Sequence, residues 1–129
     1  MLALVSAPSV LIVDDSNEVL ELHSQLARRA GLHPYTARSA EEGFRLFLEH
    51  RTHGMIAVMT DGHLEHCSGL DLALAIRALS PLPVILVSSD ATFFVREAPP
   101  GLFYRAFFKP CRMVALQEAL EAILASRQR

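Results

Sequence analysis

Short apolar runs alternate along the chain with longer segments of helical periodicity, and this alternation restricts the fold more than any other feature. Residues 10–13 form a continuous Val-Leu-Ile-Val run that ends at Asp14 and Asp15. A run that is apolar at every position is typical of a strand covered on both faces of its sheet. Repeated strand–helix units of this kind predict an α/β fold, with a doubly wound parallel sheet between two helical layers.

The chain accommodates five strand–helix units. We expect strands over residues 10–13, 33–37, 55–60, 83–87 and 106–108. We expect helices from the Ser16-Asn17 cap to about residue 30, from the Ser39 cap to about residues 53–54, over 70–79 and over 112–126. The fourth helix, inside 91–104, is predicted to be short or irregular because Pro99-Pro100-Gly101 breaks it within about two turns.

Apolar periodicity also predicts the buried faces of three helices. These are Val19, Leu22, Leu26 and Ala30 in the first helix, Phe44, Phe47 and Leu48 in the second, and Met113, Leu116, Leu120, Ile123 and Leu124 in the last.

Acidic residues gather where the strands end. Asp14 and Asp15 follow the first predicted strand, Asp61 follows the third and Asp90 comes soon after the fourth. Ligands of open α/β sheets bind outside the carboxyl ends of the strands, where these side chains meet. Three close carboxylates repel one another unless a cation lies among them. Asp14, Asp15 and Asp61 therefore predict a site for Mg²⁺, which prefers oxygen ligands.

Two further polar residues follow strands at the same edge. Ser88 ends the fourth strand, and Lys109, the only lysine in a chain with eleven arginines, follows the fifth. A hydroxyl group and an ammonium group are suited to phosphoryl oxygens. Taken singly, the aspartates are better explained as a helix cap or a strand end, and Lys109 could be a solvated loop residue. Taken together, they favour a site for a metal ion and a phosphoryl group.

Four segments in this order resemble the receiver domain of two-component response regulators. Residues 10–16 are similar to the family's first strand and acidic pair, and Asp61 with residues 69–72 is similar to its phosphoacceptor strand and following loop. Residues 83–89 are similar to the fourth strand with its hydroxyl residue, and Lys109-Pro110 to the lysine–proline pair. The resemblance covers essentially the whole chain and implies a flavodoxin-like sheet with strand order 2-1-3-4-5.

The resemblance also implies a function. Asp61 is expected to take a phosphoryl group from a histidine kinase or a histidine phosphotransfer protein. The expected metal ligands are Asp14, Asp15, Asp61 and the backbone carbonyl of His63, holding Mg²⁺ with Mn²⁺ as an alternative ion. Ser88, Ser89 and Lys109 are expected to bind the phosphoryl oxygens. A receiver catalyses only its own phosphorylation and dephosphorylation, so we expect no enzyme that turns over a free substrate.

Two positions are expected to tune the lifetime of the phosphoryl group. They are His63, two residues beyond the acceptor, and Asp90, two residues beyond the hydroxyl residue. The family's output face lies on the fourth helix, the fifth strand and the last helix, and is predicted here to include Phe93, Phe94, Tyr104 and Phe107. This apolar stretch is explained either as additional core or as a surface for a partner or a homodimer.

Some positions depart from the family pattern. Leu64 and Glu65 replace a Met-Pro pair after the acceptor, and Ala106 occupies the position of the switch aromatic. These departures and the broken fourth helix make a degenerate receiver, which binds partners without phosphorylation, the alternative prediction. A phosphohydrolase or flavin-binding protein is disfavoured, because no Asp-x-Asp pair and no Ser/Thr/Gly-rich phosphate loop follows the first strand.

Two other interpretations involve histidine and cysteine. His63, His66 and Cys67 carry possible zinc ligands, but their crowding in one loop favours solvated side chains. A redox link between Cys67 and Cys111 is less favoured than two reduced thiols.

Composition narrows the remaining possibilities. A chain of 129 residues with 51% hydrophobic residues predicts one domain. With the resemblance, this gives a single receiver domain over 1–129 with an ordered core of about 8–127. A formal charge of −2 disfavours direct nucleic-acid binding. The chain has no signal-peptide pattern and no apolar run near the ~20 residues that span a bilayer. We therefore expect a cytoplasmic protein without membrane insertion.

Overall fold

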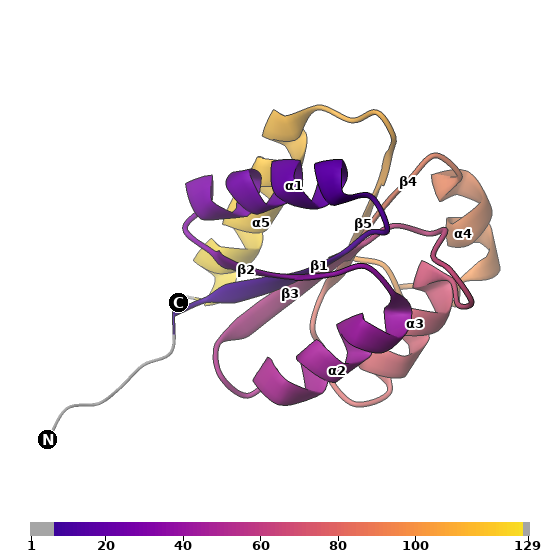
Figure 1. The fold of residues 1–129 in the computed structure, drawn as a ribbon, viewed down its shortest axis with the longest axis horizontal. Coiled ribbons are helices and arrows are strands. Elements are labelled where there is room, and N and C mark those ends of the chain that lie inside the picture. The colour runs from indigo at the N-terminus through magenta and orange to yellow at the C-terminus, as the bar shows by residue number, and fades with distance from the viewer. Residues whose placement is uncertain (1–6, 128–129) are drawn as a thin grey trace, which may run out of the picture.

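The computed structural model describes residues 7–127, and its five strands form one parallel sheet with the order β2-β1-β3-β4-β5 (Figure 1). The strands are β1 (Ser9–Val13), β2 (His33–Ala37), β3 (Met55–Thr60), β4 (Val84–Ser88) and β5 (Arg105–Phe108). The helices are α1 (Asn17–Arg29), α2 (Ala40–His50), α3 (Gly69–Arg77), α4 (Ala91–Glu97) and α5 (Met113–Arg127). The predicted doubly wound, flavodoxin-like fold is confirmed.

Two helical layers enclose the sheet. Figure 1 shows α1 and α5 on one face and α2 and α3 on the other. On the first face, alternate residues of the central strands, such as Ile12 and Ile85, pack with Leu116 and Leu120 of α5. The opposite residues, such as Leu11, pack with Phe47 of α2 and other residues of the second layer. Strands β1, β3 and β4 are buried at every position, as their continuous apolar runs predicted.

Serine side chains start three of the helices. The hydroxyl oxygens of Ser16, Ser39 and Ser68 each accept a backbone hydrogen bond from the residue three positions on. The Ser39 cap of α2 was predicted. The return bond of a capping box is displaced by one residue, because the Glu42 carboxylate accepts from the backbone N–H of Arg38 and not from that of Ser39. Ser68 forms a full capping box with Asp71, and this cap moves the start of α3 to Gly69.

The predicted helix faces are wrong at several positions. Leu22, Leu48 and Met113 have exposed fractions of 51%, 47% and 37%. In α1 the buried stripe is shifted by about one residue, because Leu20, His23 and Ala27 point into the core in place of Leu22. In α2 a Cβ at Gly43 would lie 2.8 Å from Val13, so the helix approaches β1 through its small residues and turns Leu48 outward.

The fourth helix is short, as predicted. Helix α4 has seven residues and ends at Glu97, and its C-cap residue Ala98 is extended and comes just before Pro99-Pro100. Because Pro disfavours a helical conformation in the preceding residue, the sequence itself stops the helix. Within residues 7–127, no helix is long and apolar enough to cross a membrane.

Candidate functional site

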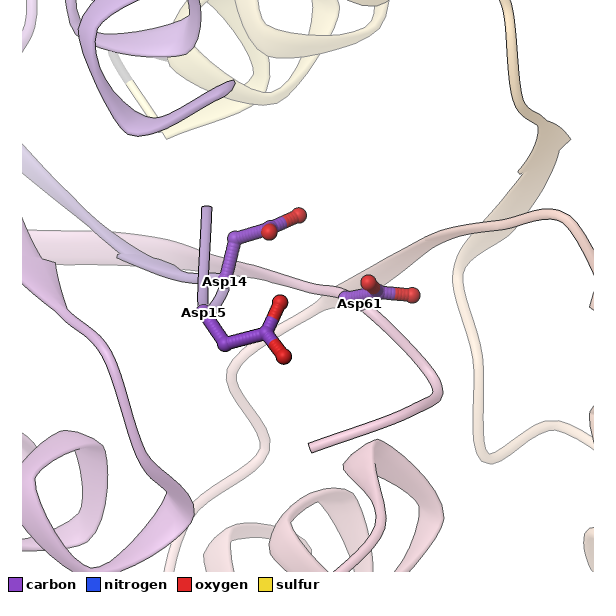
Figure 2. Close-up of side chains that lie close together, drawn as sticks. All are labelled: Asp14, Asp15 and Asp61. Carbon is purple, nitrogen blue, oxygen red and sulfur yellow. The ribbon is translucent and has the colours of Figure 1, made fainter. Parts of the chain in front are cut away.

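Three aspartates come together at the carboxyl edge of the sheet. Asp14 and Asp15 follow β1, and Asp61 follows the neighbouring strand β3. One carboxylate oxygen from each lies within 4.8 Å of the others, and Figure 2 shows the three side chains grouped at this edge. Asp14 is buried and Asp15 is exposed. The structure therefore groups the three aspartates that the strand-end pattern had selected.

Lys109 reaches into the acidic cluster from the loop after β5. Its Nζ donates to Asp14 Oδ2 at 2.7 Å and to Asp61 Oδ2 at 3.0 Å. Burial favours the neutral amine, but the hydrogen bonds and negative charges of these two aspartates outweigh it and raise the pKa of Lys109. The ammonium group therefore stays charged, and the cluster of three carboxylates contains one fixed positive charge.

The backbone around Asp61 holds its carboxylate in place. Oδ1 accepts from the backbone N–H of Gly62 at 2.6 Å and from that of His63 at 3.4 Å, while Oδ2 accepts from Lys109. A Cβ at Gly69 would collide with the backbone carbonyl oxygen of Asp61. Glycine at this position therefore lets the start of α3 pack directly against the strand end that carries the carboxylate.

Ser88 lies buried at the end of β4, next to this site. Its Oγ accepts from the backbone N–H of Asp90 at 3.1 Å, and a Cβ at Gly62 would approach that Oγ to 2.9 Å. Ser88 is therefore beside Gly62, the residue that follows Asp61. Ser89 is exposed.

The loop after Asp61 is held by apolar contacts in place of the family's proline. Leu64 is half-buried and packs on the α2–α3 side of the core, as does Cys67. Glu65 and His66 are about three-quarters exposed, and His66 adopts a φ of 69°, in the left-handed region that His, Asn and Asp enter more often than other side chains with a Cβ. The Glu65 carboxylate therefore points into solvent.

His63 and Asp90 form a contact that sequence reasoning missed. His63 Nε2 is paired with Asp90 Oδ2, which joins the loop after β3 to the loop after β4. Both residues had been selected individually for the lifetime of the phosphoryl group. Since β3 and β4 are neighbours in the expected strand order, the sequence could have placed these two loops side by side, but the pairing itself depends on how the folded loops lie.

The residues predicted for the output face divide between surface and core. Phe93 and Tyr104 are 51% and 46% exposed, and Phe107 is half-buried against the α1–α5 side of the core. Phe94 is only 4% exposed, so it contributes no surface. Its ring packs between Leu86 and Ala91, because α4 turns this residue toward the sheet.

The structure supports neither a zinc site at His63, His66 and Cys67 nor a redox link between Cys67 and Cys111. Cys67 and Cys111 are free thiols that pack on opposite faces of the sheet. Burial raises the pKa of the Cys111 thiol, which lowers its reactivity at neutral pH. Within residues 7–127, the only group of three or more potential metal ligands close enough to share an ion is Asp14, Asp15 and Asp61.

The fold and site together define a class of protein: a flavodoxin-like α/β domain with an acidic cluster and a lysine at the carboxyl edge of its sheet. A family model described as the response regulator receiver domain matches residues 10–121. The chain therefore belongs to the receiver domain family of two-component response regulators.

Solved structures superpose on the chain over nearly its full length. The N-terminal domain of an uncharacterized protein from Wolinella succinogenes is 27% identical, with a TM-score of 0.81 and coverage of 95% of this chain and 97% of that chain. A CheY-like receiver domain from Methylobacillus flagellatus is 26% identical, with a TM-score of 0.75 and coverage of 92% and 99%. The signal receiver domain of an HD domain-containing protein from Pseudomonas fluorescens Pf-5 is 25% identical, with a TM-score of 0.78 and coverage of 100% and 98%.

The acidic cluster offers the oxygen ligands that a hard divalent cation prefers. Carboxylate oxygens are ligands that Mg²⁺ and Mn²⁺ accept. Three carboxylates and one ammonium group leave two negative charges, which one divalent cation would neutralise. Asp15 is exposed, so an ion can reach the cluster from solvent. The residues present therefore fit a magnesium ion.

Proposed function

We propose that this receiver takes a phosphoryl group on Asp61 from a phosphohistidine of a histidine kinase or a histidine phosphotransfer protein. The observation that carries this proposal is the double hydrogen bond of Lys109 to Asp14 and Asp61. The charged Lys109 side chain lies between the buried Asp14 carboxylate and the partly exposed Asp61 carboxylate. Since an ammonium group has three donors, Lys109 can also donate to an oxygen of a phosphoryl group transferred to Asp61.

The transfer is a displacement at phosphorus. A carboxylate oxygen of Asp61 forms a new O–P bond, the P–N bond of the phosphohistidine breaks, and the imidazole of the partner leaves with the electron pair. The product is an acyl phosphate on Asp61. The Lys109 ammonium offsets negative charge on the transferred group, and Ser88 Oγ supplies a hydrogen bond once it is released from the Asp90 N–H.

Asp14, Asp15 and Asp61 are the proposed side-chain ligands of Mg²⁺, with the backbone carbonyl of His63 as a further ligand. When bound, the ion neutralises charge on the phosphoryl oxygens. The protein residues hold and orient the acceptor: the Gly62 and His63 backbone donors fix one oxygen of Asp61, and Lys109 fixes the other.

In this proposal the protein is a switch that modifies only itself. It turns over no free substrate, and the phosphoryl group changes the surface of α4, β5 and α5 for a protein partner or for a second copy. We propose that residues 1–129 act as one receiver domain in the cytoplasm, with no direct contact to nucleic acid.

Intact mass spectrometry tests the proposal. The protein is incubated with acetyl phosphate, with Mg²⁺ or with EDTA, and compared with Asp61→Asn and with Glu65→Gln, a matched change of an exposed carboxylate in the same loop. We expect one added phosphoryl group in the parent and in Glu65→Gln, only with Mg²⁺, and none in Asp61→Asn. An adduct that persists in Asp61→Asn would contradict the assignment of the acceptor.

A degenerate receiver is the second candidate, and one observation favours it. Ala106, at the position of the family's switch aromatic, is exposed and lines a hollow of about 200 Å³ between α4 and β5. Phe108 also lines this hollow, but Ala106 itself places only a methyl group there, so the usual route through an aromatic side chain at this position is missing. If the parent protein gains no phosphoryl group with ample Mg²⁺ and donor, this second function replaces the first.

A further inference from the structure

Two loops meet over the proposed acceptor through one pair of side chains. His63 Nε2 is paired with Asp90 Oδ2, and these side chains are 61% and 55% exposed. Ion pairs with this much solvent around them are weak, because water screens the charges and competes for the hydrogen bond. The pair is therefore a contact that a stronger anion can displace without disturbing the core.

Asp90 holds the position that should cap α4, yet its carboxylate makes no capping hydrogen bond. Asp is among the best N-cap residues, since its oxygen can accept from backbone N–H groups of the first turn. Ser16, Ser39 and Ser68 make such bonds at the starts of α1, α2 and α3. Two features thus keep the Asp90 carboxylate from capping α4: its pairing with His63, and its backbone (φ −111°, ψ 37°), which lies outside the extended region of the three capping serines.

The His63 side also contacts α4 directly. The His63 ring meets the buried Phe94 ring edge to face, with centroids 5.0 Å apart and an interplanar angle of 70°. A Cβ at Gly62 would collide with that same Phe94 ring. The residues that immediately follow Asp61 are therefore packed against α4, and a change in their position is transmitted to the helix.

We infer that phosphorylation of Asp61 draws the His63 imidazole away from Asp90, and that the freed Asp90 carboxylate then caps α4. This inference rests on the proposed phosphorylation of Asp61. His63 is two residues from the acceptor, and its backbone N–H already donates to Asp61 Oδ1. A phosphoryl group brings close to two negative charges and strong acceptor oxygens to this position, against the single charge of Asp90.

The exchange supplies a route from the site to the output face that does not use Ala106. In the unmodified state the Asp90 carboxylate is paired with the His63 imidazole, and α4 begins without a side-chain cap. In the phosphorylated state the imidazole N–H donates to a phosphoryl oxygen, and Asp90 accepts from the backbone N–H of Phe93, the third residue of α4. The helix is then more firmly closed at its first turn.

Backbone amide hydrogen exchange, followed by mass spectrometry over residues 91–97, tests the exchange of partners. The parent is measured before and after treatment with acetyl phosphate and Mg²⁺, with intact mass as the record of phosphorylation. We expect about fivefold slower exchange in the first turn of α4 after phosphorylation, the size that one capping hydrogen bond implies.

Three variants separate this mechanism from a general tightening of the protein. In His63→Ala the carboxylate of Asp90 is free from the start, so the slow exchange should be present without phosphorylation. In Asp90→Ala no cap can form, so exchange should stay fast in both states. His66→Ala is the matched control, because its imidazole lies in the same loop near Glu65, and it should behave as the parent does.

The outcomes separate this inference from the proposed function. If the parent gains no phosphoryl group, the proposed function fails, while His63→Ala still reports whether releasing Asp90 protects α4. If His63→Ala leaves α4 exchange at the parent rate, or if phosphorylated Asp90→Ala is protected as strongly as the phosphorylated parent, the inferred exchange is wrong.

Discussion

Single residues at the site divide into those the fold needs and those it does not. Asp14 is 2% exposed, and its two oxygens accept from Lys109 and from the backbone of Ser16, so its carboxylate is part of the folded framework. The Asp15 carboxylate is exposed and forms no hydrogen bond or ion pair with residues 7–127, although its oxygen lies within 4.8 Å of the other two. Asp15 thus adds repulsion to the cluster, and its proposed role is that of a metal ligand only.

We predict that Asp15→Asn leaves the metal-free protein as stable as the parent but weakens its response to Mg²⁺. In EDTA the free energy of unfolding by urea should change by less than about 0.5 kcal/mol, as for other exposed positions. With Mg²⁺ the parent should gain stability in proportion to its affinity. The variant should need at least about tenfold more Mg²⁺ for the same gain, since even indirect partners of metal ligands have effects of that size.

Glu18→Gln provides the control, because Glu18 lies in the first turn of α1 and outside the cluster. Its response to Mg²⁺ should match that of the parent. An unchanged response in Asp15→Asn would remove Asp15 from the set of ligands.

Among the elements, α4 is the one that depends most on close packing with its neighbours. It has seven residues, no side-chain cap and two buried residues, Ala91 and Phe94. The Phe94 ring lies so close to Gly62 that no side chain fits there. The position of this short helix is therefore fixed from outside, by the loop that follows Asp61.

We predict that Gly62→Ala destabilises the protein by about 1–3 kcal/mol, the usual cost of an added methyl group in a packed contact. Urea unfolding measures the change. In a Phe94→Leu background the same substitution should cost less, because the colliding ring atoms are gone and only the approach to Ser88 Oγ at 2.9 Å remains. Equal costs in the two backgrounds would show that the close approach of Phe94 is not the cause.

For the whole molecule, pH acts on stability through a histidine buried beside the acidic cluster. His23 on α1 is 7% exposed and lines a hollow of about 330 Å³ with Lys109 and Cys111. Burial is the main cause that lowers the pKa of His23 from its ordinary value of 6.5, with Lys109 acting in the same direction and Asp14 and Asp61 opposing it. The folded protein therefore favours the neutral ring.

We predict that the stability contributed by neutral His23 is lost as the pH falls below about 6.5. Below that pH the unfolded chain binds a proton that the folded protein resists, so the unfolding free energy declines. Urea unfolding of the parent and of His23→Leu between pH 8 and pH 5 checks this. The parent should lose more stability than the variant over that range, and parallel curves would contradict the assignment.

Much of this molecule could be predicted from local pattern. The strands over 33–37 and 55–60 have the expected bounds. Every residue of the second run is apolar or β-branched, whereas the first run, His-Pro-Tyr-Thr-Ala, is only partly buried. Asp14, Asp15, Asp61 and Lys109 could be grouped because parallel strands bring their carboxyl ends to one edge. The Pro99-Pro100-Gly101 break set the length of α4, because proline acts on the backbone locally.

Other features were decided only by tertiary packing. Periodicity could not tell whether Leu22 or His23 faces the core, because that depends on the rotation of α1 against the sheet. The Gly43 approach to β1, the burial of Phe94 and the pairing of His63 with Asp90 each join segments distant in sequence. The chain thus determines its strand ends and their charges by local chemistry, while contacts between loops require the folded distances that packing sets.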